Sequence, residues 1–134
     1  MADPVFDMQV AIVAALKADA AVAAIVGSRV EDGRPSAYPA ITIGPSDYVP
    51  LDLGCISARE FSLQIDCWVR DSSTRFNPLY ALTGAVKAAL HDVRLPLATH
   101  ALANLLVAQV RHLRDPDGLT LHGVISLDAL LEER

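Results

Sequence analysis

Histidines and cysteines are the side chains with the clearest potential for metal binding or nucleophilic chemistry in this chain of 134 residues. A hairpin predicted around residues 115–118 places His112 and His122 nearly opposite each other but on different faces of a sheet. The two side chains therefore cannot easily share a metal ion. Cys55 and Cys67 have neither metal-type nor redox spacing. The sequence therefore predicts no metal site and no cofactor.

Aspartates and serines offer no better catalytic arrangement. Asp66 and Asp128 are expected to point outward into solvent, whereas a working acid–base pair needs a pocket that shifts its pKa values. Ser72 and Ser73 lie in a polar connector without the glycine-flanked turn of a nucleophile elbow. The segment 27–29 is too short for a phosphate loop and lacks its lysine, so it is interpreted as a helix end. We predict that the chain is not an enzyme.

Length and composition indicate a single folded domain. With 134 residues, 52% of them hydrophobic, the chain can bury one sizeable core, and we expect one domain over residues 1–134. The net charge of −5 argues against binding to nucleic-acid backbones. No apolar run approaches the roughly 20 residues that span a bilayer, and we see no secretory signal. We therefore expect no membrane contact and production in the cytoplasm.

One segment, Glu60–Arg70, alternates between apolar and polar residues, which is typical of a strand with one buried and one outer face. The single tryptophan, Trp68, falls on the polar side with Asp66 and Arg70. Because tryptophan is enriched among interface anchor residues, we predict that this face contacts another protein chain. The inward positions are Phe61, Leu63, Ile65, Cys67 and Val69.

The last third of the chain predicts a hairpin around Asp115–Gly118, because proline suits the second position of a type I turn and glycine the left-handed position after it. Pairing Asp115 opposite Gly118 puts apolar residues on one face: Leu106, Ala108, Val110, Leu121, Ile125 and Leu127. The other face receives Gln109, Arg111, Thr120, His122 and Ser126. Arg111 and His122 thereby join Trp68 as candidate interface residues.

Apolar residues at helical spacing predict the remaining elements. A first helix begins at Asp3-Pro4, a short helical turn runs from Asp19 to Gly27, and a second main helix begins at Asn77-Pro78 and ends near Asp92. Residues 29–31 and 40–43 are expected to be extended. The order predicts an α+β fold: an antiparallel or mixed sheet of about four strands with two main helices packed on one face.

The stretch from Pro45 to Ala58 shows no sustained periodicity and is predicted to be a long loop or a hairpin excursion. Loops of this length in compact domains are usually functional. Asp47, Tyr48 and Asp52 are its candidate contacts with a partner.

These segments together resemble the tail-terminator, or tail-completion, proteins of long-tailed phages and gene transfer agents. The resemblance depends on the order and spacing of five motifs over most of the chain. The motifs are LKADAAVAAIVGSRV (16–30), YPAITIG (38–44), FSLQIDCWVRD (61–71), LYALTGAVKAALHD (79–92) and RDPDGLTLHGVISLDALLE (114–132).

The resemblance implies an assembly role without catalysis. Proteins of this kind form rings, typically hexameric, on the head-proximal end of a tail tube, where they stop tube growth and join the tail to the head. The implied partners are further copies of the chain, the major tail tube protein and head–tail connector proteins, with DNA passing through the channel without specific binding. The implied location is the neck of a virion or phage-like particle. Another connector protein (a stopper or adaptor) and a small ligand-binding module are the alternatives.

Overall fold

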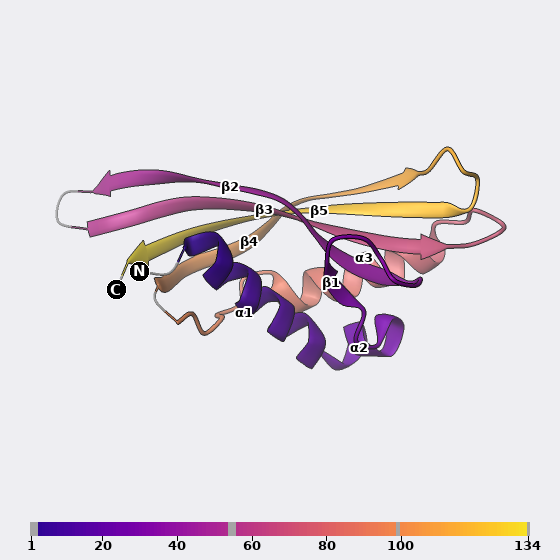
Figure 1. The fold of residues 1–134 in the computed structure, drawn as a ribbon, viewed down its shortest axis with the longest axis horizontal. Helices are drawn as coiled ribbons and strands as arrows, with labels where there is room; N and C mark the ends of the chain where they lie inside the picture. The colour runs from indigo at the N-terminus through magenta and orange to yellow at the C-terminus, as the bar shows by residue number, and fades with distance from the viewer. Residues whose placement is uncertain (1–2, 54–55, 99, 134) are drawn as a thin grey trace.

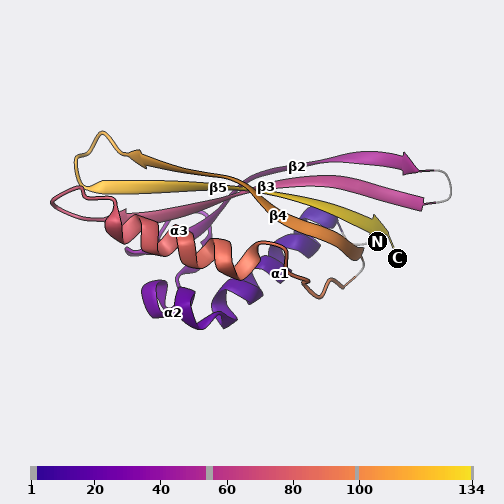
Figure 2. The ribbon, with the colours of Figure 1, turned by 180° about the vertical axis from the view of Figure 1, so that it is seen from behind.

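One mixed β-sheet with helices on a single side organises the chain (Figures 1 and 2). The computed structural model describes residues 3–53, 56–98 and 100–133. Its strands lie in the order β1-β2-β3-β5-β4; β1 runs parallel to β2, and the other neighbours are antiparallel. The elements are α1 (Pro4–Ala18), α2 (Ala20–Val26), β1 (Val30–Asp32), β2 (Ala40–Leu53), β3 (Ile56–Arg70), α3 (Asn77–Leu90), β4 (His100–Arg114) and β5 (Thr120–Glu133).

The predicted α+β class is confirmed, but the sheet is larger than the predicted one of about four strands. The described residues form five strands, and the sheet is mixed because β1 is parallel to its neighbour. This additional strand has three residues and pairs with Ile41–Ile43 across an intervening loop. So short a strand shows no alternation, so the sequence could indicate an extended piece but not its partner.

Aspartates begin both N-terminal helices, as the sequence predicts. Asp3 accepts a hydrogen bond from the Val5 amide over 2.8 Å, and Asp19 accepts one from the Val22 amide over 3.0 Å. These carboxylates satisfy amides that have no acceptor within the helix. The axes of α1 and α2 differ by 83° at Asp19. Among the described residues no single helix is long and apolar enough to cross a membrane; only this bent pair reaches that length and composition.

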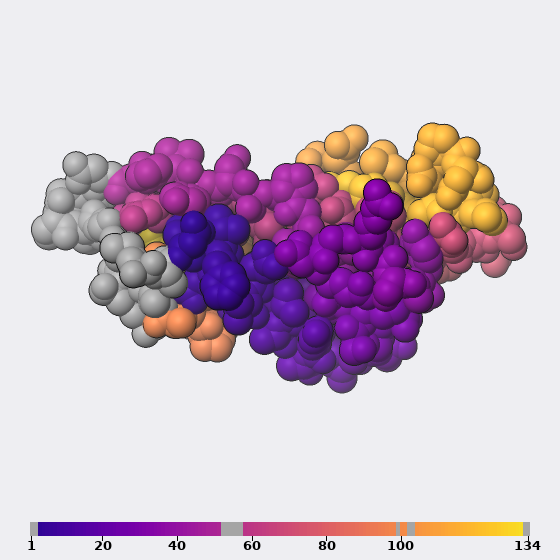
Figure 3. Space-filling model, in the orientation of Figure 1, coloured from indigo at the N-terminus to yellow at the C-terminus, as the bar shows by residue number. Residues whose placement is uncertain are grey.

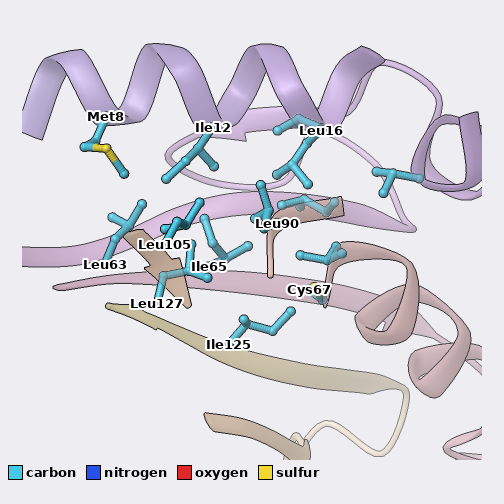
Figure 4. Close-up of a cluster of buried hydrophobic side chains, with 14 of the residues drawn as sticks. Met8, Ile12, Leu16, Leu63, Ile65, Cys67, Leu90, Leu105, Ile125 and Leu127 are labelled. Atoms are coloured by element: carbon cyan, nitrogen blue, oxygen red, sulfur yellow. The ribbon is translucent and has the colours of Figure 1, made fainter. Parts of the chain in front are cut away.

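The hydrophobic core lies between the helices and the inner face of the sheet (Figure 4). Met8, Ile12 and Leu16 of α1 point toward the strands and are fully buried. Burying side chains of this size contributes about 1.5–3 kcal/mol each. The facing predicted for β3 is confirmed, because all five inward positions are buried: Phe61, Leu63, Ile65, Cys67 and Val69.

Of the two forms predicted for the stretch from Pro45 to Ala58, the described residues adopt the hairpin and not the long loop. They continue β2 and β3 as a hairpin that extends past the start of α1 (Figures 1 and 3). The pairing shifts register between Ile43 and Ser46, so Pro45 falls in a bulge. Pro50 lies where β2 forms the edge of the sheet, since β1 reaches only Ile43. Proline is tolerated in bulges and on edge strands because no ladder bond needs its missing N–H.

The turn at Asp115–Gly118 is confirmed, but the strands pair in a different register. The Asp115 amide donates to the Thr120 carbonyl over 2.9 Å, so Asp115 lies opposite Thr120 rather than Gly118. A shift of two residues leaves side-chain facing unchanged. Val110 therefore packs against the core as predicted, opposite Ile125.

A bulge between Val107 and Gln109 overturns the predicted facing farther along β4. An extra residue in one strand reverses the face on which the following side chains lie. Leu106 accordingly pairs with Asp128 on the outer side and is 39% exposed, and Ala108 is exposed as well. The prediction that both point into the core was wrong.

Candidate functional site

The candidate site is the side of the sheet opposite the helices, which we call the open face (Figure 1). Trp68 lies there as predicted, but it packs against its own chain and is half-buried. Its indole stacks on the His122 imidazole with 3.9 Å between ring centroids and 6° between ring planes. Its Nε1 donates to Thr42 Oγ1 over 2.9 Å. The polar edge of the indole is therefore satisfied within the chain, as half-buried tryptophans usually require.

Asp66 is buried beside this stack, contrary to its predicted solvent-exposed position. Its Oδ1 accepts hydrogen bonds from His122 Nε2 over 2.7 Å and from Gln64 Nε2 over 2.8 Å. Its Oδ2 lies over Gly44, where an added Cβ would come within 2.6 Å of it. Gly44 thus leaves room for the carboxylate, and the two donors compensate its removal from water.

Two arginines are exposed on the open face toward the β4–β5 turn. Arg70 lies over the Tyr38 ring, 4.1 Å from its centroid, and its Nε donates to Thr120 Oγ1 over 3.3 Å. Arg111 lies on β4 in the row that passes through Asp66. Neither guanidinium forms an ion pair with a carboxylate in the part of the chain that the structure describes.

Three carboxylates gather toward the other end of the open face. Asp47 and Asp128 flank Ser62 in one row across β2, β3 and β5, and Ser62 Oγ donates to Asp128 over 3.1 Å. Glu60 lies two residues farther along β3. These side chains border two open hollows of about 320 and 400 Å³. The larger hollow is also lined by exposed apolar side chains, Val49 and Leu106.

Of the other two predicted contacts, Tyr48 does not join this face. Tyr48 pairs with Phe61 on the inner side of the sheet, beyond the helices, and is 37% exposed. Asp52 lies in β2 opposite Ser57, and its side chain is outside the described part. Cys55, which has no metal-type or redox spacing from Cys67, also lies outside the described residues.

The described part of the open face shows no catalytic or metal-binding arrangement. Within the described chain, His122 forms no hydrogen bond with a hydroxyl or thiol that it could activate. No group of three or more metal-binding side chains occurs there either. The open face presents the stacked rings of Trp68 and His122 at its centre. The arginines lie toward one end of this face and the carboxylates toward the other.

Sequence reasoning found the arginines and Asp47 but not the gathering of carboxylates. Asp128 was interpreted as an ordinary solvated residue and Glu60 was not singled out, because each is separated from the others along the sequence. Period-two alternation does place Glu60 on the outer face of its strand. Only the register of β2, β3 and β5 brings Asp47 and Asp128 into one row.

Comparisons with known proteins agree with this architecture. The family of the tail completion protein gp17 matches residues 10–132. Among solved structures, a chain from the virion of a native gene transfer agent particle has a TM-score of 0.86, with 24% identity over 96% of each chain. At that identity the similarity shows a shared fold. The comparison with curated proteins finds no match.

Proposed function

This chain belongs to the family of the tail completion protein gp17, and we propose that it is a structural subunit of a phage-like tail. Copies of it form a ring, typically hexameric in the proteins it resembles, on the head-proximal end of the tail tube. The ring ends tube polymerisation and provides the surface that joins tail to head. Its location is the neck of a virion or gene transfer agent particle.

The family match over residues 10–132 carries this proposal, because it includes nearly all the described helices and strands. The solved chain with the same fold comes from a gene transfer agent virion, which supports a place in a particle of that kind.

We assign the contacts between neighbouring subunits of the ring to the open face. Identical subunits in a ring contact one another through two different surfaces on each copy. The proposed contact residues Trp68, Asp66, Arg70, Arg111 and His122 all lie on the open face. Asp47, proposed as a further contact, lies on the same face at its other end.

DNA passes through the ring without specific binding. A nonspecific grip on DNA depends on clusters of Lys and Arg that neutralise phosphates. The chain has a net charge of −5. Such a subunit suits a channel that must let DNA slide.

Electron microscopy of purified protein mixed with tail tubes tests the proposal. The expected result is a disc at one end of each tube and no further growth when tube protein is added. Portal and connector proteins are the matched alternative targets. Binding to these with no binding to tube ends would indicate a stopper or adaptor, and a monomer that binds neither would overturn the assembly role.

A further inference from the structure

The exposed charged side chains of the open face separate by sign along the strands, whereas the buried Asp66 lies in the row of Arg111. We name Asp47, Glu60 and Asp128 the acidic end, and Arg70 and Arg111 the basic end. On β5, the row of Arg111 lies at Val124 and that of Asp128 four residues later. At about 3.4 Å per residue, the nearest rows of the two ends are roughly 14 Å apart.

Neither end is neutralised within the chain. The three carboxylates of the acidic end and the two guanidinium groups of the basic end form no ion pair with another described residue. Asp128 accepts a hydrogen bond only from the neutral Ser62, and Arg70 donates to the neutral Thr120. Asp117 is the acidic group near Arg70, but its carboxylate is already bonded to amides and a hydroxyl of its own turn.

Both ends also expose apolar surface next to their charges. Leu106 and Val49 are 39% and 55% exposed at the acidic end, and Leu113 is 38% exposed in the row of Trp68 and His122. Apolar anchors surrounded by polar groups are the usual composition of a protein interface. Each end therefore combines an apolar contact with charges that the other end complements.

We propose that neighbouring copies contact each other through the open face, with the basic end of one subunit lying on the acidic end of the next. This contact rests on the ring given as the proposed function. Arg111 and Arg70 lie against the carboxylates around the two hollows. The two ends of one subunit contact two different neighbours, so the contact is heterologous, and repeating it generates a closed ring or a filament. Because the charges are exposed before contact, we expect assembly to weaken at high salt.

Charge reversal with complementation tests the contact. One double variant, Asp47→Arg with Asp128→Arg, has two basic ends, and the other, Arg70→Glu with Arg111→Glu, has two acidic ends. Each alone should assemble roughly tenfold or more weakly than the unmodified protein, because like charges then face each other. An equal mixture should assemble again, since every contact in an alternating ring regains opposite charges.

The control carries the change of net charge of the Arg70→Glu with Arg111→Glu variant, but on the helical side. Lys17→Glu with Lys87→Glu alters two exposed lysines on α1 and α3 and should leave assembly unchanged. Normal assembly of both open-face variants, beside rings of the unmodified protein, would overturn this contact and leave the ring standing. Failure of the unmodified protein to form rings, alone or on tube ends, would instead overturn the proposed function.

A cross-link keeps the test informative if a reversed variant fails to fold. Arg111→Cys with Asp128→Cys, in a Cys55→Ser background, introduces one thiol at each end. Within one copy the two positions are roughly 14 Å apart along the strands, too far for a disulfide, which needs Cα atoms within about 7 Å. Oxidation should give a ladder of linked subunits. A product that stays monomeric while rings are present would contradict the contact.

Discussion

The Trp68 indole and the His122 imidazole lie parallel, with 3.9 Å between their centroids, on neighbouring strands β3 and β5. The stack joins the strands on the side that no helix covers. It explains why a large aromatic occupies an outer position even before any partner binds. Trp68 therefore contributes to the stability of the subunit, and we propose that it also belongs to the surface that a neighbour meets.

Replacing Trp68 separates these two contributions. Trp68→Ala removes the stack and the bond to Thr42, and we expect the free energy of unfolding to fall by about 2 kcal/mol, less than the 3–5 kcal/mol of a fully buried aromatic. Trp68→Phe keeps a ring against His122 and should lose only about 1 kcal/mol, mainly the hydrogen bond. Urea titration of both variants measures the difference; equal losses would contradict a stabilising stack.

Assembly of the same variants is measured where the monomer remains folded. Trp68→Ala should form fewer rings than Trp68→Phe at equal folded concentration, because the aromatic surface of the open face is lost. Unimpaired rings from Trp68→Ala would remove Trp68 from the interface and leave its structural role intact.

The sequence predicted what depends on local pattern. Alternation in β3 correctly separated Cys67 and Ile65, which are fully buried, from Trp68 on the open face. Helix starts at Asp3 and Asp19 were also predictable, because capping depends on residues only two or three positions away.

Features set by pairing between distant segments were not predictable. The bulge between Val107 and Gln109 has no sequence signature, yet it turns Leu106 outward. Pro45 and Pro50 break the alternation of β2, although a bulge and a sheet edge tolerate them. The burial of Asp66 likewise depends on His122 and Gly44, from two other strands.

Acid should weaken the β4–β5 turn through Asp117. Hydrogen bonds from the Thr120 hydroxyl, the Leu119 amide and the Thr120 amide lower the pKa of Asp117 from its usual 3.8 to about 2. Because the folded-state pKa is below the unfolded one, this carboxylate stabilises the fold above about pH 4, and the contribution is lost as the pH falls toward 2.

Asp117→Asn checks this pH dependence. The stability difference between the unmodified protein and Asp117→Asn should be largest at neutral pH and should shrink between pH 4 and 2 in urea titrations. Asp115→Asn is the matched control, since the Asp115 side chain accepts no hydrogen bond from the described residues. A difference that stays constant down to pH 2 would contradict a linkage through Asp117.

Cys67 should be unreactive in the folded protein. Burial in the core raises the pKa of its thiol strongly, and the nearby Asp66 carboxylate raises it further, so almost no thiolate exists at pH 8. In a Cys55→Ser variant, a thiol reagent should label Cys67 only after urea unfolding. Labelling of the native protein as fast as that of the unfolded chain would contradict its place in the core.

Close packing of α3 on β5 depends on the absence of a side chain at Gly123. An added Cβ there would lie 2.6 Å from Thr83 Cγ2 and 3.2 Å from Leu79 Cδ1. We expect Gly123→Ala to destabilise the fold by about 1–3 kcal/mol through overpacking. Gly84→Ala is the matched control on α3: its Cβ meets nothing within 4 Å, so the fold should gain about 0.5–1 kcal/mol.

A double variant locates the strain of Gly123→Ala at one methyl group. Thr83→Ser removes Cγ2 but keeps the hydroxyl, which donates to the Leu79 carbonyl over 3.1 Å and lies 2.9 Å from His112 Nε2. Gly123→Ala with Thr83→Ser should therefore be more stable than the sum of the two single changes predicts. Urea midpoints of the four proteins in this cycle measure the coupling. Strict additivity would show that α3 moves away from β5 as a whole, and that Thr83 is not the contact that makes glycine necessary.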